Sequence, residues 1–205
     1  MSETTTGVHR LLSWPRAYEL LQVAVGSNSS HRRFVADYVR PAERTRLLDI
    51  GCGPAHILRA LPTGVRYVGV DLNADYIAAA RREWGDRGEF LCTPVSELAL
   101  DDREFDVVMT MGLLHHLDDA DCAGLFELVR GVLAPGGRFI AVDPAYAPGQ
   151  SRVARWLIGR DRGAHVRLAD AYGELARRWF PSARVSTRTD LLRVPYTHAV
   201  LEAGG

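Results

Sequence analysis

The sequence contains no lysine, because all 25 of its basic residues are arginines. This excludes a lysine Schiff base and the lysine of a phosphate-binding P-loop. Acidic residues also number 25, so the formal net charge is zero, which argues against a nucleic-acid partner held mainly through phosphates. No apolar run approaches the roughly 18 residues of a membrane-spanning helix, and the opening MSETTTGVHR lacks the apolar core of a signal peptide. We therefore expect a cytoplasmic protein that binds neither nucleic acid nor membrane.

Cysteine is also scarce, with Cys52, Cys92 and Cys122 as its three occurrences. The number is odd and the spacing fits no zinc pattern, so we expect reduced thiols and no metal site. A length of 205 residues suits a single domain. The sequence does not indicate the oligomeric state, so a monomer and a homodimer both remain open.

The chain is organised around LLDIGCGPAHI, from Leu47 to Ile57. Its first residues form a short apolar run that predicts a buried parallel strand. Gly51 and Gly53 predict a tight turn that brings the backbone close to a ligand. Pro54 suits the first turn of a following helix, whose free N–H groups favour an anion. Such a strand, turn and helix predict a nucleotide-like cofactor at the carboxyl end of the first strand of a doubly wound sheet.

From Arg46 onward, strands alternate with helices, which predicts a mostly parallel sheet. In the N-terminal part we expect a helix over 11–25 and a second one that Ser30 caps and Pro41 stops. Asn73, Asp118 and Asp119 suit helix starts. The expected strands are 46–50, 66–70, 89–92, 105–111, 138–142, 183–189 and 196–202, and the later helices are 73–84, 120–133, 151–158 and 169–180.

Asp71 ends the second strand, RYVGVD, where a carboxylate can accept hydrogen bonds from ribose hydroxyls. This position alone would also suit NAD in a dehydrogenase. The NAD pattern GxGxxG, however, needs a glycine where His56 stands. The short form DIGCG resembles motif I of class I S-adenosylmethionine-dependent methyltransferases. VGVDLN, FDVVMTMGLLHHLDD and LAPGGRFIAVDP resemble later motifs of that family, in the right order, between about Leu47 and Pro144.

The resemblance implies a Rossmann-like α/β fold with seven strands, the last of them antiparallel. It implies one methyltransferase domain over 1–205, with an N-terminal helical lid over 1–41 and a core over 42–205. The core would carry a substrate-side insertion at about 144–180.

The resemblance also implies S-adenosyl-L-methionine as cofactor and S-adenosyl-L-homocysteine as product. The glycine turn would contact the methionine part, Asp71 the ribose, and Leu72 and Val95 the two faces of the adenine. Asn73 is either part of this site or a plain helix cap. Many relatives have an aspartate after strand three, where this chain has Cys92-Thr93-Pro94, so Thr93 or the backbone would have to meet the adenine amino group. The implied cofactor residues are Asp49, Gly51, Cys52, Gly53, Asp71, Leu72, Asn73, Thr93, Pro94, Val95, Met111 and Gly112.

Methyl transfer to oxygen usually needs a base, and histidine suits this role because its ordinary pKa lies near neutrality. His115 and His116 follow strand four, and we take His115 as the first choice. Asp143, at the end of strand five, would orient or assist it, or would simply cap the loop before Pro144. The LHHL signature is also compatible with a purely structural role of both histidines.

The substrate-side candidates are less specific. Trp14, Arg16 and Tyr18 would line a lid, or would bury an apolar helix face. Arg162 and Arg167 would bind an anionic or polar group of the substrate, because a guanidinium recognises carboxylate or phosphate in two-point fashion, or would belong to an ion-paired loop. Further polar candidates are Tyr146, Tyr172 and His198.

These features predict a methyltransferase acting on a small-molecule acceptor, at oxygen in the first place and otherwise at nitrogen or carbon. Two other classes stay open, since a fold does not fix a function. The protein could bind the cofactor and catalyse a reaction other than methylation, or it could be a non-catalytic partner of another enzyme.

Overall fold

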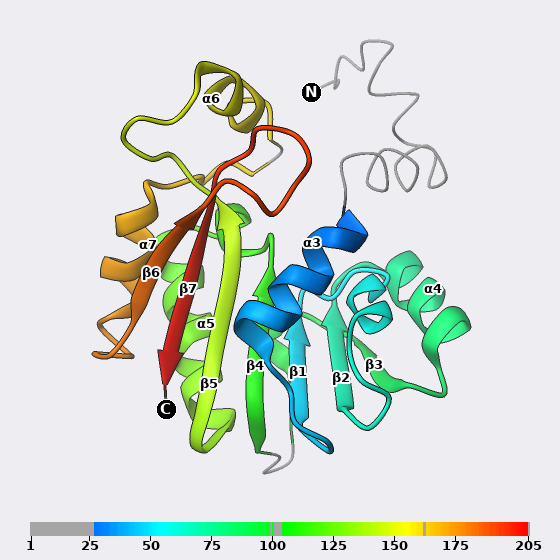
Figure 1. The fold of residues 1–205 in the computed structure, drawn as a ribbon. Helices are drawn as coiled ribbons and strands as arrows, with labels where there is room; N and C mark the ends of the chain where they lie inside the picture. The colour runs from blue at the N-terminus through cyan, green and yellow to red at the C-terminus, as the bar shows by residue number, and fades with distance from the viewer. Residues whose placement is uncertain (1–26, 99, 101–103, 162, 205) are drawn as a thin grey trace, which may run out of the picture.

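The computed structural model describes residues 27–98, 100, 104–161 and 163–204. Within these residues one seven-stranded sheet forms, in the order β3-β2-β1-β4-β5-β7-β6 (Figure 1). Strands β1 to β5 are parallel, and β7 runs antiparallel to both β5 and β6. The predicted Rossmann-like sheet with an antiparallel last strand is confirmed. The strands are β1 Arg46–Ile50, β2 Arg66–Asp71, β3 Gly88–Cys92, β4 Phe105–Met111, β5 Leu133–Pro144, β6 Arg184–Arg188 and β7 His198–Gly204.

The helices cover both faces of this sheet (Figure 1). Asn73 begins α4 as predicted, because its side chain accepts hydrogen bonds from the amides of Asp75 and Tyr76. Asp118 begins α5 in the same way. The helices are α3 Ser27–Phe34, which continues as the π-helical turn η1 Val35–Val39, then α4 Ala74–Trp84, α5 Asp119–Val132, α6 Arg152–Ile158 and α7 Ala169–Ala176, with short 3-10 turns η2 His56–Arg59, η3 Val95–Glu97 and η4 Leu114–His116.

Three helix predictions were wrong in detail. Ser30 does not begin a helix, because α3 already includes Ser27. The helix expected after the glycine turn is only the four-residue 3-10 turn η2, because Ala55 adopts a left-handed conformation with φ 56°. The helix expected to reach Phe180 ends at Ala176. The helix expected over 11–25 and most of the N-terminal lid lie outside the described residues.

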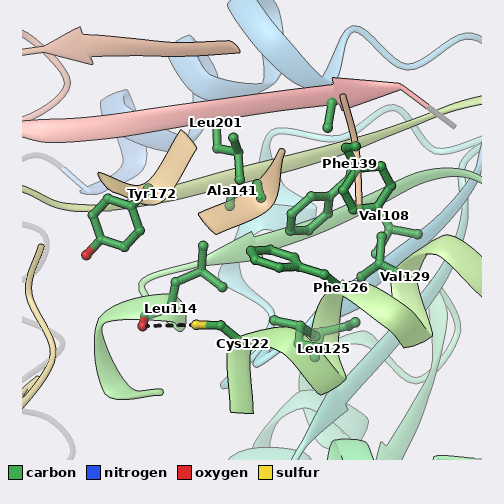
Figure 2. Close-up of a cluster of buried hydrophobic side chains, with 14 of the residues drawn as sticks. Val108, Leu114, Cys122, Leu125, Phe126, Val129, Phe139, Ala141, Tyr172 and Leu201 are labelled. Atoms are coloured by element: carbon green, nitrogen blue, oxygen red, sulfur yellow. Dashed lines mark hydrogen bonds between the residues drawn. The ribbon is translucent and has the colours of Figure 1, made fainter. Parts of the chain in front are cut away.

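Alternate residues of the central strands point to opposite faces of the sheet and pack in two hydrophobic cores. Leu48 and Val108 face the side covered by α5 and α7, whereas Leu47 and Val107 face the side of α3 and α4. Figure 2 shows the first core, in which Phe126 of α5 lies against Phe139 of β5. The two cores hold the strands of the sheet together. Because β1 to β5 are parallel, their carboxyl ends lie along one edge of the sheet. Among the described residues, no helix is long and apolar enough to cross a membrane.

Candidate functional site

The glycine turn after β1 is tied to the end of β2. Gly51 and Gly53 have φ of 77° and 53°, conformations that favour glycine. The amides of Gly51 and Cys52 both donate to the Val70 carbonyl, at 2.8 and 3.0 Å. The Gly53 amide donates to Asp71 Oδ2 at 2.8 Å, and Asp71 Oδ1 accepts from the Asn73 amide at 2.8 Å. The sequence-predicted turn and carboxylate therefore lie side by side.

Asp49 lies beneath this turn and not on its surface. It is buried, and its Oδ2 accepts a 2.6 Å hydrogen bond from the Tyr67 hydroxyl, while Oδ1 has no partner among the described residues. Burial raises the pKa of Asp49 to about 7 and outweighs the hydrogen bond from Tyr67, which lowers it. Cys52 also points inward, because a Cβ on Gly69 of β2 would lie 2.9 Å from its Sγ. Both residues support the turn from below.

The other predicted cofactor residues follow β2, β3 and β4 at the same edge. Leu72 is 69% exposed directly after Asp71. Because Asp71 pairs with Cys92, Thr93 and Pro94 begin the neighbouring loop, and Val95 there packs against the first core. Gly112 follows Met111 with φ 67°, and its amide donates to Val142 of β5 at 2.8 Å. The sheet thus brings these residues to one edge.

His115, in η4 after β4, is buried between two carboxylates. Its Nδ1 lies 2.7 Å from Asp143 Oδ1, which also accepts the His115 amide at 3.0 Å. Its Nε2 lies 3.1 Å from Asp161 Oδ1. Burial lowers the pKa of His115, but the hydrogen bonds and charges of Asp143 and Asp161 outweigh burial and raise it to about 9. The ring is therefore protonated at neutral pH.

Asp161 belongs to the loop after α6 and was not predicted as a site residue. Burial raises its pKa, but hydrogen bonds from His115, Tyr196 and Gly163 outweigh it and hold the pKa well below its usual range. Its Oδ2 accepts the Tyr196 hydroxyl at 2.7 Å, and its Oδ1 accepts the Gly163 amide at 3.0 Å. The loop then returns over η4, where the His165 amide donates to the His115 carbonyl at 2.9 Å. In the sequence, Asp161 stands between Arg160 and Arg162, and this charged stretch before Gly163 was its only signal.

His116 differs from His115 in its exposure, in its hydrogen bonds and in the direction of its pKa shift. It is exposed, and no hydrogen bond of its ring is found among the described residues. The two imidazole rings are 4.1 Å apart between centroids. Burial and the positive charge of His115 lower the pKa of His116. His116 is therefore neutral at physiological pH, whereas His115 is charged.

Arg167 lies in an ion-paired loop, which is one of the two interpretations that its sequence left open. Its guanidinium donates to Asp119 Oδ1 at 2.6 Å and to the carbonyls of Leu114 and Leu117, each at 2.9 Å. These bonds fasten the loop to η4 and to the start of α5. Figure 2 shows that the Cys122 thiol of α5 points at the same Leu114 carbonyl, so η4 is also tied to α5.

The remaining substrate candidates are scattered. The Tyr172 hydroxyl donates to the Pro144 carbonyl at 3.0 Å from within the core, and Tyr146 stacks under Arg155. His198 lies beside Tyr196, and burial lowers its pKa to about 4. Trp14, Arg16, Tyr18 and Arg162 lie outside the described residues. In the described part of the chain no group of three or more His, Cys, Asp or Glu side chains is arranged to hold a metal ion.

Comparison with known sequences agrees with this geometry. Residues 47–137 match the family model described as a methyltransferase domain. The chain is 33% identical over 134 residues to the ubiquinone biosynthesis O-methyltransferase of Bradyrhizobium sp. (strain ORS 278), covering 58% of this chain and 50% of the relative. The chain thus spans about half the length of the curated relatives it matches.

Solved structures share the fold at low identity. The pyocyanin biosynthetic protein PhzM superposes with a TM-score of 0.74 and 17% identity, covering 96% of this chain and 61% of that one. The [4+2]-cyclase SpnF superposes with a TM-score of 0.64 and 18% identity, covering 86% of this chain and 80% of that one. These similarities concern the fold alone.

Proposed function

We propose that this chain, which carries a class I S-adenosylmethionine-dependent methyltransferase domain, transfers a methyl group from S-adenosyl-L-methionine to a hydroxyl oxygen of a small molecule. The observation that carries the proposal is the contact between the glycine turn and Asp71, where the Gly53 amide meets the carboxylate. It joins the ends of β1 and β2 beside the point where the strand order reverses, which is where doubly wound sheets bind ligands.

The residues at this edge fit the cofactor. A Cβ on Gly53 would meet no atom within 4 Å, so the turn presents its bare backbone. Asp71 is half-buried, and each of its carboxylate oxygens accepts one hydrogen bond from a backbone amide. Each oxygen therefore has a lone pair left for a hydrogen bond from a ribose hydroxyl. The exposed Leu72 offers an apolar surface to one face of the adenine. When bound, S-adenosyl-L-methionine supplies a methyl group on a positively charged sulfur that leaves as a neutral thioether.

The chain's own contribution to the chemistry is the histidine at the end of β4. Asp143 binds Nδ1 of His115 and thereby fixes the ring with Nε2 directed towards the substrate-side loop. Because the ring is already protonated at neutral pH, Nε2 donates a hydrogen bond to the acceptor oxygen and does not take up its proton. His116 is the candidate base, because it is neutral and exposed.

The acceptor class is supported by the relatives and by the chain's charge. The similar protein of Bradyrhizobium is named an O-methyltransferase of ubiquinone biosynthesis, which favours a hydroxyl oxygen as the atom that is methylated. The balanced charge of the chain favours a small acceptor over a nucleic acid. We therefore propose a small-molecule O-methyltransferase that works in the cytoplasm.

The first test is calorimetric titration with S-adenosyl-L-methionine and S-adenosyl-L-homocysteine. Micromolar binding is expected for the wild type. Asp71→Ala should abolish this binding, and Asp71→Asn should weaken it, because the amide keeps one acceptor oxygen for the Gly53 amide. Asp75→Ala is the matched control, since Asp75 is exposed in the first turn of α4 and its substitution also removes one negative charge.

The outcomes separate the possible functions. A folded wild type that binds neither compound would sink the methyltransferase proposal. Binding followed by product formation without consumption of S-adenosyl-L-methionine would instead support a non-methylating enzyme, a possibility suggested by the shared fold of SpnF. Binding without turnover of any acceptor would support a non-catalytic partner.

A further inference from the structure

We propose that Asp161 stands in for the oxygen of the acceptor, and that the acceptor binds as an anion, a phenolate, enolate or carboxylate, by displacing this carboxylate from Nε2 of His115. The inference rests on the proposed function, because it assigns the acceptor class of the same site. It makes Asp161 a specificity-determining residue and an internal competitor of the substrate.

The two carboxylates around His115 have different settings. The Asp143 side chain is 2% exposed at the end of β5, and it binds both Nδ1 and the amide of His115. The Asp161 side chain is 26% exposed and lies on an irregular loop, 3.1 Å from Nε2. Asp143 is thus built into the sheet, whereas Asp161 approaches the ring from the substrate side.

The contacts of the loop permit such an exchange. Asp161 is held by the Tyr196 hydroxyl and the Gly163 amide, and both groups can donate to water or to the acceptor once the carboxylate has moved. Figure 1 shows α6, which precedes the loop, above the carboxyl ends of the strands. An acceptor that comes from the side of α6 would therefore have to take the place of the Asp161 carboxylate to reach Nε2 of His115.

Charge decides which acceptor can replace Asp161. His115 is a buried imidazolium with two carboxylate partners, and removing one partner leaves buried charge uncompensated. An anionic oxygen replaces Asp161 charge for charge, whereas a neutral aliphatic alcohol does not. The methylated product is a neutral ether or ester, so it cannot balance the imidazolium, and Asp161 returns to Nε2. The same exchange thus favours binding of the acceptor and release of the product.

The test uses 4-nitrophenol as the probe, because its phenolate absorbs visible light and its neutral form does not. The probe is titrated, with S-adenosyl-L-homocysteine present and absent, into wild type, Asp161→Asn and Asp161→Ala. Removal of the competing carboxylate should tighten phenolate binding about 10- to 100-fold, the range expected for one hydrogen bond between charged groups. Asp170→Ala, which removes an exposed acid of α7, should leave the affinity unchanged.

Two further measurements make the test specific. The neutral 4-nitroanisole should bind equally to the wild type and to both Asp161 variants. His115→Gln should lose the preference for the phenolate over the anisole. Thermal melting checks that each variant is folded, and Asp161→Asn keeps the size of the side chain should Asp161→Ala loosen the loop.

The results distinguish this inference from the proposed function. If folded Asp161 variants bind the phenolate no more tightly than the wild type while S-adenosyl-L-homocysteine still binds, the inference is overturned and the methyltransferase proposal stands. If the phenolate binds more tightly to both variants but neither cofactor form binds, the anion site stands and the methyltransferase proposal fails.

Discussion

Gly163 allows the loop after α6 to rest directly on His115, and adding one methyl group there should lift the loop off. A Cβ at Gly163 would lie 1.9 Å from Cδ2 and 2.7 Å from the carbonyl oxygen of His115. The imidazole cannot move aside, because Asp143 and Asp161 hold both of its nitrogens. Gly163→Ala should therefore displace the loop and break the contact between Asp161 and His115.

The size of the effect follows from these contacts. Overpacking of this kind costs about 1–3 kcal/mol, and a lost hydrogen bond between charged groups adds about 1.5–3 kcal/mol. Together they amount to about 2.5–6 kcal/mol, which lowers the melting temperature of a domain of this size by about 5–24 °C.

Gly124 offers a matched control for the same substitution. It lies exposed within α5, and a Cβ there would meet no atom within 4 Å. Gly124→Ala should stabilise the helix by about 0.5–1 kcal/mol, so the two variants should shift the melting temperature in opposite directions. Differential scanning calorimetry measures both. If Gly163→Ala has the same melting temperature as the wild type, the loop does not rest on His115 as the structure places it.

Two other predictions concern the same region. Arg167→Ala should lower the free energy of unfolding in urea by about 2 kcal/mol, because the carbonyls of Leu114 and Leu117 lose their donor, whereas the exposed Arg152→Ala should change it little. An equal loss in both variants would refute this role of Arg167. Burial lowers the pKa of His115, but Asp143 and Asp161 outweigh it and raise the pKa from 6.5 to about 9, so the contribution of His115 to stability is full below about pH 6.5 and is lost as the pH rises through about 9. Urea unfolding across this range should show the decline in the wild type but not in His115→Asn, and parallel profiles would contradict the buried ion pair.

Local sequence determined most of the sheet. Strands β1 and β4 begin and end at the predicted residues, because each is a short run that is apolar on both faces of a buried parallel sheet. Asn73 and Asp118 begin their helices as predicted, since the hydrogen bonds of a cap involve only neighbouring amides. Gly51, Gly53 and Asp71 could also be predicted from the local sequence, because they follow or end strands that the sequence itself indicates.

Other local predictions failed where packing decided the outcome. The sequence SNSS offers several residues able to begin a helix, and the structure includes Ser27 in α3. After the glycine turn, Ile57 and Leu58 bury their side chains in a four-residue turn instead of a longer helix. Arg167 shows a related limit, because its charge left a substrate ligand and an ion-paired loop both open, and only the structure shows its partners in a distant turn.

The chemistry of His115 depends both on the local sequence and on the tertiary structure. The sequence placed a histidine after β4 and an acid at the end of β5, and parallel pairing of these strands is enough to bring them together. Asp161 lies on a loop without periodic pattern, so nothing local indicates where its side chain points. Only the tertiary structure closes that loop on the ring, where a second carboxylate turns a candidate base into a buried imidazolium. Through-space electrostatics of this kind depend on distances between remote segments, which the order of residues does not contain.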